Sequence, residues 1–386
     1  MAKPHSQVAA NSIAVIGGGQ LARMMQPPAI ELGIHLRLLA EGPDVSAAQV
    51  IPDHLVGDHR DLEDLRRAAE GCAVVTFDHE HVPPEHLRAL TAEGHVPRPG
   101  PDALLFAQDK ALMRVRLAEL GVPVPAHRVV DGPAALDEFA ESVGGYPVVV
   151  KTTRGGYDGK GVWIVGDATE ADEAFGAGQP IMAEELVFFT RELSAQVARR
   201  PSGDMVNYPI VESRQADGIC KEVVAPAPEL GAARDYEART IARTIAEALD
   251  VTGMLAVELF ETMDGRLLVN ELAMRPHNTG HWSIEGASTS QFENHLRAVL
   301  DLPLGPVETL ERWSVMVNVL GGAVEDLEAQ LPIVLAAVPE AHVHLYGKAV
   351  KAGRKVGHVT VVGDDLAWTI ERARRAADLL EKGTAR

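Results

Sequence analysis

The sequence has few cysteines and no long apolar run. Its two cysteines, Cys72 and Cys220, are too few and too far apart for a disulfide framework or a thiolate zinc site, as is typical of a reducing compartment. No run of about 18 apolar residues is present, so the sequence predicts no membrane span. Residues 1–10 also lack the apolar stretch of a signal peptide. We therefore expect a cytoplasmic protein.

Basic residues are also in deficit. The chain has 36 Lys and Arg against 55 Asp and Glu, a formal charge of -19, which disfavours nucleic acid as the main partner. Its 386 residues, of which 46% are hydrophobic and 24% charged, are typical of a globular protein of two or three domains.

The N-terminal part of the chain alternates between short apolar runs and amphipathic stretches. Residues 12–16 predict a buried strand, a glycine-rich turn follows, and residues 21–32 predict a helix. Further strands are expected at 36–39 and 73–77, with a charged helix at 61–70 between them. This βα alternation predicts a doubly wound parallel sheet, so the fold class is α/β.

The pattern changes twice further along the chain. A helix is expected at 110–120, after which Pro147 opens a new strand ending at Lys151. We expect three domains, at residues 1–110, 111–304 and 305–386. The last is predicted to be a small β-rich module with strands at 315–320, 342–345 and 356–362 and a closing helix at 366–380.

The first glycine cluster places Gly17, Gly19 and Ala22 between a strand and a helix, where free backbone amides can hold an anion. Three uses of this turn remain open. A dinucleotide site would use Glu41 for a ribose hydroxyl, a plain tight turn would serve packing, and a phosphate-bearing substrate would bind the amides.

The second glycine cluster, 155–161, lies between the strand-like runs 148–151 and 162–165, so it is predicted to be a hairpin loop. A Walker A loop is excluded, because Lys160 is followed by a glycine and a strand instead of Ser or Thr and a helix. Glycine amides can still fold over a polyphosphate, with Lys151 as a point charge beside it. A long flexible turn is the alternative.

Two apolar runs, 255–260 and 267–272, flank the dipeptide Asp264–Gly265. Asp-Gly is the preferred two-residue hairpin turn, so we expect an antiparallel hairpin with these residues at its centre. That register sets Phe260 opposite Val269.

The same register sets Glu258 directly opposite Glu271. At about 5 Å and an effective dielectric constant near 20, their repulsion is about 3 kcal/mol, more than the roughly 0.2–1 kcal/mol of an ordinary cross-strand pair. A divalent cation compensates best, and oxygen ligands on Glu258, Asn270 and Glu271 suit Mg²⁺ or Mn²⁺ bridging nucleotide phosphates. A shared proton or a slipped register is the alternative.

The loop 275–282 is dense in groups that can hold a polar ligand. His277 and His281 as a zinc pair lack a third soft ligand nearby, so substrate contact is favoured. Near the C-terminus, residues 341–363 carry four basic residues and no acidic one, which attracts an anion unless the patch is a plain solvated face. The four are Lys348, Lys351, Arg354 and Lys355.

With these motifs in place, the chain resembles the ATP-grasp ligases, and among them the 5-(carboxyamino)imidazole ribonucleotide synthetase family of bacterial purine biosynthesis. Five ordered segments carry the resemblance: 17–24, 155–161, 269–272, 275–282 and 353–358. Three positions depart from the family pattern, namely Ala22 in place of Gly, Asp78 in place of Glu, and Gln215 where the family often has Asn or His.

The resemblance implies a central ATP-grasp domain with two β-rich lobes. It also implies that ATP phosphorylates bicarbonate to carboxyphosphate, which carboxylates the amine of aminoimidazole ribonucleotide and releases ADP and phosphate. ATP and two Mg²⁺ or Mn²⁺ ions are the expected cofactors, and a homodimer is the expected assembly. Alternatives are another ATP-grasp ligase, such as a formate-dependent glycinamide ribonucleotide transformylase, a nicotinamide-dependent oxidoreductase, or a nucleotide-sensing module without catalysis.

The resemblance also implies site residues. The metal ligands are Glu258 and Glu271, and the catalytic residues are Lys151, Arg275 and Asn270. The residues implied for ATP are Lys110, Lys151, Gly156, Tyr157, Asp158, Gly159, Lys160, Gly161, Val162, Glu184, Glu185, Leu186, Val187, Glu192, Gln215, Asn270 and Glu271. The residues implied for the imidazole nucleotide are Gln20, Leu21, Asp78, Glu80, Tyr157, Asp158, Arg275, His277, Asn278, Lys348 and Arg354.

Overall fold

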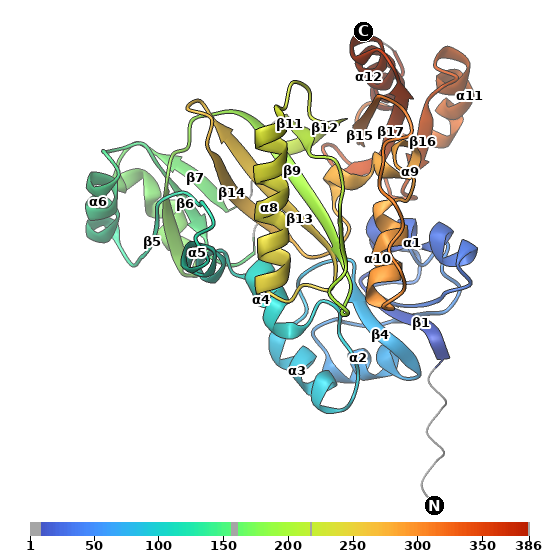
Figure 1. The fold of residues 1–386 in the computed structure, drawn as a ribbon, viewed down its shortest axis with the longest axis horizontal. Coiled ribbons are helices and arrows are strands. Elements are labelled where there is room, and N and C mark those ends of the chain that lie inside the picture. Colours follow the sequence, from blue (N-terminus) through green and yellow to red (C-terminus); the bar gives the residue numbers. More distant parts are fainter. Residues whose placement is uncertain (1–8, 156–160, 217, 385–386) are drawn as a thin grey trace, which may run out of the picture.

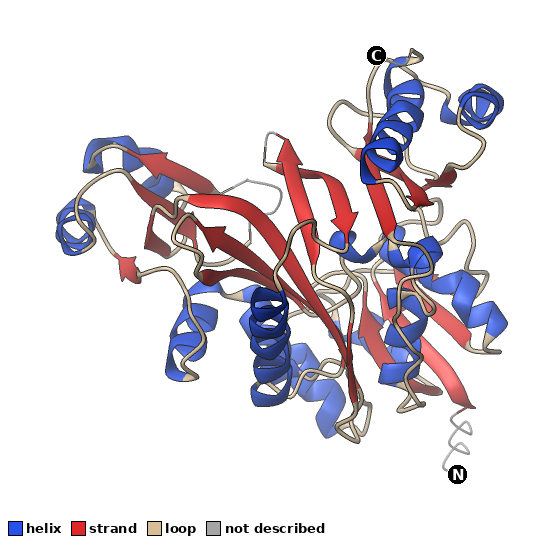
Figure 2. Cartoon of the chain, turned by 45° about the horizontal axis from the view of Figure 1, so that its top comes forward, coloured by secondary structure: helices blue, strands red, loops and turns tan. Residues whose placement is uncertain are grey.

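The computed structural model describes residues 9–155, 161–216 and 218–384 (Figure 1). Its strands form three sheets. Two are small, and the third runs through the middle of the molecule and on towards the C-terminus (Figure 2). No helix in the described part of the chain is long and apolar enough to cross a membrane.

The N-terminal sheet is parallel and has the order β3-β2-β1-β4. Its strands are β1 (Ala9–Ile16), β2 (His35–Ala40), β3 (His54–Val56) and β4 (Cys72–Phe77). The accompanying helices are α1 (Gln20–Glu31), α2 (Leu62–Ala69), α3 (Pro84–Ala92) and α4 (Pro101–Gln108). Alternate β1 residues enter different cores, Ile13 with α1 on one face and Ala14 with α2 on the other, which confirms the doubly wound prediction. The sequence reading missed β3, a strand of three residues of which none is buried.

A second, four-stranded antiparallel sheet forms the smaller lobe of the central region, in the order β5-β8-β6-β7. Its strands are β5 (His127–Val130), β6 (Val148–Thr152), β7 (Val162–Val165) and β8 (Ile181–Glu185). The helices nearby are α5 (Lys110–Glu119), α6 (Pro133–Ser142), the 3-10 turn η1 (Ala168–Ala171) and α7 (Asp172–Gly176). Lys151 pairs with Val162, which confirms the hairpin predicted around the second glycine cluster.

The largest sheet has the order β14-β13-β9-β11-β12-β15-β17-β16, with β10 beside β9. Its strands are β9 (Phe189–Arg199), β10 (Met205–Asn207), β11 (Val211–Ala216), β12 (Ile219–Ala225), β13 (Gly253–Thr262), β14 (Leu267–Ala273), β15 (Trp313–Leu320), β16 (His342–Leu345) and β17 (Lys355–Gly363). The helices of this part are α8 (Ala232–Ala248), η2 (Asn278–Gly280), α9 (Ser283–Gly286), α10 (Gln291–Val299), α11 (Leu327–Ala337) and α12 (Leu366–Lys382).

The three predicted C-terminal strands are confirmed as β15, β16 and β17, but they do not form a sheet of their own. Strand β12 of the central region pairs with β15, with Ala225 opposite Ser314. The backbone ladder therefore continues from the larger central lobe into the C-terminal module.

The β13–β14 hairpin differs from its predicted form at the turn. Gly265 N–H donates to the carbonyl of Thr262, and Thr262 N–H donates to the carbonyl of Arg266, so the connection is longer than two residues. Gly265 has φ 80, a left-handed value that favours glycine. The predicted pairing of Phe260 with Val269 is therefore wrong, and Phe260 lies opposite Leu268.

A β-bulge corrects this shift before the carboxylates are reached. The register changes between Glu258 and Leu259, because Leu259 pairs with Val269 while Glu258 pairs with Glu271. The extra residue is Asn270 on β14. A bulge sets two residues of one strand against one of the other. The predicted pairing of Glu258 with Glu271 is confirmed, but it results from two irregularities that cancel.

Candidate active site

The first glycine turn is occupied by carboxylates of the chain itself. Asp78, just after β4, accepts Gly19 N–H at 2.7 Å and Ala22 N–H at 2.9 Å. Glu41, just after β2, accepts Gly18 N–H at 3.1 Å. The predicted anion at this helix N-terminus is thus intramolecular, and one oxygen of Glu41, Oε2, is engaged by Gly18 N–H.

The approach of Asp78 explains why the turn contains a glycine at position 19. A Cβ atom there would lie 2.2 Å from Asp78 Oδ2, too close for any side chain. Burial raises the pKa of Asp78 to about 6, although the two amides oppose this shift. Both oxygens of the carboxyl accept a backbone amide.

A buried ion triad joins the two lobes of the central region. Glu184 on β8 lies 2.6 Å from Lys151 Nζ on β6 and 2.5 Å from Arg114 Nε on α5. Arg114 also donates to the carbonyl of Val269 on β14, at 3.0 Å. Burial alone would raise the pKa of Glu184, but the two cations outweigh it and hold that pKa at about 2. Burial lowers the pKa of Lys151, and Glu184 opposes that shift.

The lysines predicted to contact phosphate do lie beside the glutamate hairpin. Lys151 Nζ is 3.4 Å from Asn270 Oδ1, and Lys110 Nζ is 3.6 Å from Glu271 Oε1. Lys110 also donates to the carbonyl of Gly155 at 3.1 Å, where the second glycine loop begins. Gly156, Tyr157, Asp158, Gly159 and Lys160, predicted for this loop, lie outside the described residues. The two amines converge from α5 and β6 on the bulged part of β14.

Glu258 is the acidic centre of the site. Burial, the neighbouring charge of Glu271 and then that of Glu192 raise the pKa of the Glu258 carboxyl well above its usual range. An excess of carboxylate on a bulged hairpin is a set of hard oxygen donors that fits Mg²⁺ or Mn²⁺. With Asn270 beside them, Glu258 and Glu271 are the residues that would hold such an ion.

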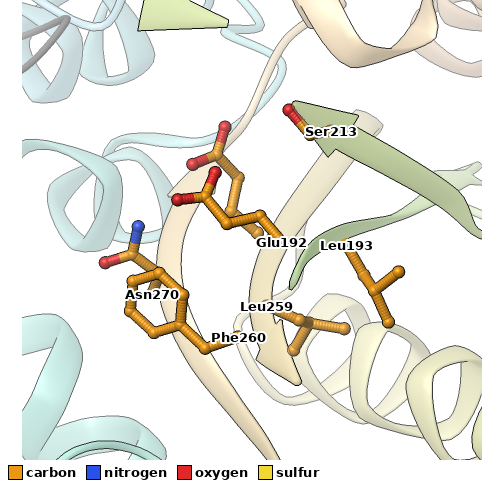
Figure 3. A pocket seen from close by; sticks show the side chains of 7 residues that line it. Glu192, Leu193, Ser213, Leu259, Phe260 and Asn270 are labelled. Atoms are coloured by element: carbon orange, nitrogen blue, oxygen red, sulfur yellow. The ribbon is translucent and has the colours of Figure 1, made fainter. Parts of the chain in front are cut away.

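A small pocket connects this acidic centre with Glu192 on β9 (Figure 3). It is lined by Glu192, Leu193, Ser213, Glu258, Leu259, Phe260 and Asn270. Gln215 Nε2 donates to Glu192 Oε2 at 2.7 Å, and burial raises the pKa of Glu192. Gln215 thus reaches the residue expected at the ribose, although it departs from the family pattern.

The stretch expected along adenine lies where β8 ends and the chain crosses between lobes. Glu184 faces inward to its two cations, so its carboxylate is already used. Glu185 accepts Ala126 N–H at 3.0 Å and is half-buried. Leu186 and Val187 follow in the connection to β9. Their position between the two lobes is compatible with an adenine contact, which stays a prediction.

On the other side of Glu258 lie residues expected for the imidazole nucleotide. His277 Nε2 is 3.5 Å from Glu258 Oε1, while its Nδ1 accepts Thr279 N–H. Burial lowers the pKa of His277 to about 3, so the ring is neutral and presents Nε2–H to the carboxylate. Arg275 Nε donates to Glu80 Oε2 at 2.8 Å, which joins the loop after β14 to the loop after β4.

The C-terminal module reaches the same region. Lys348 Nζ donates to Gln20 Oε1 at the start of α1. Ser46 Oγ donates to the carbonyl of Tyr346 at 2.6 Å, and Gln49 Nε2 to that of Gly347 at 2.8 Å. Lys348 is therefore held against the first glycine turn, and its contact with substrate stays a prediction.

Other predicted residues are placed differently. Leu21 is buried in the core beneath α1. Arg354 donates to the carbonyl of Ala349 at 3.3 Å, within its own loop. Asn278 Nδ2 is buried, and the Asn278 side chain lies beside the thiol of Cys220.

The structure does not bring His277 and His281 together as zinc ligands. His277 turns to Glu258 and Thr279. His281 Nδ1 instead lies 3.0 Å from Gln291 Nε2, and the centroid of its ring is 5.0 Å from that of His358. This alternative is wrong for the described part of the chain.

Sequence reasoning missed Arg114. Its side chain is 1% exposed, although arginine is seldom buried. The signal was its position on α5, next to Met113 and three residues before Leu117, both of which are buried. A charged residue on the apolar face of a helix needs a buried partner, and Glu184 is that partner.

Comparison with known proteins matches three family models in chain order. They are a ribonucleotide synthetase preATP-grasp domain over residues 10–108, an ATP-grasp domain over 115–292, and a phosphoribosylaminoimidazole carboxylase C-terminal domain over 314–372. Together with the two-lobed centre, these matches define the chain as an ATP-grasp enzyme, a ligase class that forms carbon–nitrogen bonds.

Among curated relatives, the N5-carboxyaminoimidazole ribonucleotide synthase of Mycobacterium tuberculosis is 50% identical over 378 residues, 96% of this chain and 88% of the relative. That of Corynebacterium ammoniagenes is 51% identical over 379 residues, 95% and 91% of the two chains. The chain therefore belongs to the N5-carboxyaminoimidazole ribonucleotide synthase family.

A solved structure of this enzyme from Aspergillus clavatus, in complex with ADP and 5-aminoimidazole ribonucleotide, superposes with a TM-score of 0.88. It is 34% identical, and the match covers 96% of this chain and 99% of the other. The Thermus thermophilus structure has a TM-score of 0.86 at 40% identity, covering 96% and 98%.

Proposed function

We propose that the chain uses ATP to carboxylate the exocyclic amine of 5-aminoimidazole ribonucleotide with bicarbonate, through carboxyphosphate. ATP transfers its terminal phosphoryl group to bicarbonate, and the amine then attacks the activated carbonyl carbon and releases phosphate. One structural observation carries the proposal. Glu258 stands between two sets of groups, with Glu271, Lys110 and Lys151 on one side and His277 on the other.

The first set suits a nucleotide triphosphate. Phosphoryl transfer needs alignment and charge neutralisation more than covalent help from the protein. Lys110 and Lys151 supply positive charge beside the start of the second glycine loop. An ion held by Glu258 and Glu271 would neutralise the transferring phosphoryl group. We propose Mg²⁺ or Mn²⁺ for it, with two ions when ATP is bound.

The second set suits a sugar phosphate with a polar base. Lys348 is held at the first glycine turn, while Arg275 and His277 approach from the loop after β14. We propose that the ribonucleotide lies between these groups, with Gln20, Glu80, Asn278 and Arg354 along its edge. The Aspergillus clavatus structure, which contains ADP and this nucleotide at 34% identity, supports the same pairing of ligands.

The reaction can be tested by following ADP release and product with purified protein. ADP release should require both bicarbonate and aminoimidazole ribonucleotide. Glu271→Gln should lower it by roughly 10²–10³-fold, because the charge on the transferring group is then less well neutralised. Glu247→Gln, on an exposed position of α8, is the matched control and should keep full activity.

A substrate panel separates this function from other ATP-grasp reactions. Turnover with formate and glycinamide ribonucleotide, and none with bicarbonate, would contradict the proposal. So would full activity in Glu271→Gln. We further propose a cytoplasmic homodimer, which light scattering of the purified chain can test.

A further inference from the structure

Three potential metal ligands meet at one edge of the N-terminal sheet. Glu41 follows β2, His59 follows β3, and His79 follows β4. In a parallel sheet the carboxyl ends of all strands lie along one edge, and this edge is where such sheets bind ligands. The topology therefore gathers residues that are distant in sequence.

Their donor atoms are close enough to share an ion. One ligand atom from each side chain lies within 4.8 Å of the others, and His79 Nε2 is 3.8 Å from Glu41 Oε1. Four-coordinate zinc, with bonds of about 2.0–2.2 Å, sets its ligand atoms about 3.3 Å apart. Small side-chain adjustments close that difference. Among the described residues, no other three such side chains bring their donor atoms as near.

The donor atom of His79 has no other use. Its Nε2 is buried and has no hydrogen-bond partner in the described part of the chain. A buried polar atom without a partner is costly and calls for an explanation. Its Nδ1 accepts His81 N–H at 3.1 Å, a bond that is given up when the proton moves to Nδ1 and Nε2 binds an ion.

Both rings favour the neutral state, which metal binding requires. Burial lowers the pKa of His79 to about 3, helped by the nearby rings of His59 and His81. Burial also lowers the pKa of His59, against the opposing effect of Asp58. Neutral imidazole is the ligand that divalent metals require, so no proton has to be displaced from an imidazolium at neutral pH.

We propose that Glu41, His59 and His79 form a binding site for one divalent transition metal ion, with Zn²⁺ as the best match. Two imidazole nitrogens and one carboxylate oxygen suit zinc and its neighbours, whereas Mg²⁺ prefers oxygen ligands alone. The site therefore differs in chemistry from the oxygen donors of Glu258, Glu271 and Asn270.

The ion would tie together the ends of three strands. Glu41 keeps its second oxygen on Gly18 N–H, so metal binding also secures the first glycine turn. The expected result is a more stable N-terminal domain in the presence of the metal.

Cobalt titration of the metal-free full-length protein is the direct test, because Co²⁺ replaces Zn²⁺ and its visible absorption reports coordination number. Excess Mg²⁺ is included to fill sites made of oxygen ligands. We expect saturation at one Co²⁺ per chain with the strong absorption of a four- or five-coordinate ion. Glu41→Gln, His59→Gln and His79→Gln should each weaken binding at least tenfold. His95→Gln, which changes a histidine of the same domain outside the site, should leave it unchanged.

Thermal unfolding provides a second, independent measurement. Glu41→Gln keeps an oxygen that can accept Gly18 N–H, so this variant should fold and unfold like the unmodified chain in EDTA. Zn²⁺ should raise the unfolding temperature of the unmodified chain but not that of Glu41→Gln. Absence of saturable Co²⁺ binding, or binding that all three variants retain, would overturn the proposal. Equal loss in His95→Gln would do the same.

Discussion

The first glycine turn and the β13–β14 hairpin solve opposite electrostatic problems. The turn has an excess of backbone donors, and Asp78 and Glu41 satisfy them from within the chain. The hairpin has an excess of carboxylate. Burial, Glu271 and Glu192 raise the pKa of Glu258 strongly, and Lys355 and Arg275 offset this only in part. The comparison shows that a motif predicts an external ligand only where other residues of the chain do not already satisfy its hydrogen-bond donors or balance its charge.

The largest expected change in the free energy of unfolding concerns Glu184, a carboxylate near the hairpin that is paired with two cations. Arg114→Met would leave Glu184 buried with Lys151 as the one remaining cation that pairs with it among the described residues. Removing one partner of a buried ion pair costs about 3–5 kcal/mol, so we expect a loss of that size in the free energy of unfolding, measured in urea. Arg116→Met, on the exposed side of the same helix, should change it by less than about 0.5 kcal/mol. Equal losses would show that the triad contributes no special stability.

Removing one carboxylate oxygen from the first glycine turn should lower the free energy of unfolding by less. Asn in place of Asp78 has one acceptor oxygen instead of two, so the amide of either Gly19 or Ala22 loses its partner. We expect Asp78→Asn to lower the free energy of unfolding by about 1–3 kcal/mol in the same assay. Asp102→Asn, at an exposed helix start, is the control. If Asp78→Asn left the free energy of unfolding unchanged, Asp78 would not be needed to satisfy the amides of the turn, and the comparison would fail.

Removing a carboxylate from the β13–β14 hairpin should instead raise the free energy of unfolding. A raised pKa means that the folded chain holds the Glu258 proton more tightly than the unfolded chain does. Stability therefore falls as the pH rises from the usual glutamate pKa, about 4.3, towards the raised value. Glu258→Gln lacks this decline, so without metal it should be more stable than the unmodified chain by about 1–3 kcal/mol near pH 8.5.

That gain should shrink towards pH 4, where the carboxyl is protonated in the folded chain and mostly protonated in the unfolded chain, and urea unfolding across the pH range measures it. Activity should be lost at every pH. A variant that is less stable than the unmodified chain at high pH would show that the hairpin carboxylates are already compensated.

The smallest expected effect is at the edge of the pocket. Gln215→Ala removes the amide that holds Glu192, so we expect the KM for ATP to rise about 3–10-fold with little change in kcat. Gln215→Asn keeps an amide on a shorter side chain, so its KM for ATP should lie between those of the unmodified chain and Gln215→Ala. Steady-state kinetics at saturating bicarbonate measure this, and an unchanged KM in Gln215→Ala would remove Gln215 from the nucleotide site.

Local patterns in the sequence predicted most elements of the fold. The βα alternation at the N-terminus, the hairpin around the second glycine cluster and the three C-terminal strands are all periodic signals of one segment. The pairing of β12 with β15 could not be predicted, because it joins segments far apart in the chain. The turn at Gly265 and the bulge at Asn270 were missed for a related reason: hydrophobic alternation does not reveal an extra residue.

The sequence predicted which types of residue gather at the site better than it predicted which residues pair with each other. The predicted lysines and glutamates do lie near one another around the β13–β14 hairpin, while their roles stay predictions. Which carboxylate meets which cation depends on three-dimensional packing, so the sequence suggested neither the Asp78 contacts with the turn nor the role of Arg114.

The contact between Lys348 and Gln20 has a consequence for how the enzyme is made. Gln20 leaves the ribosome 328 residues before Lys348 does. The site proposed for the ribonucleotide therefore cannot be completed on a nascent chain that ends before Lys348, even if the N-terminal sheet has already folded. Translation that stops before Lys348 would release a product that carries the residues proposed for ATP but lacks part of the site proposed for the ribonucleotide.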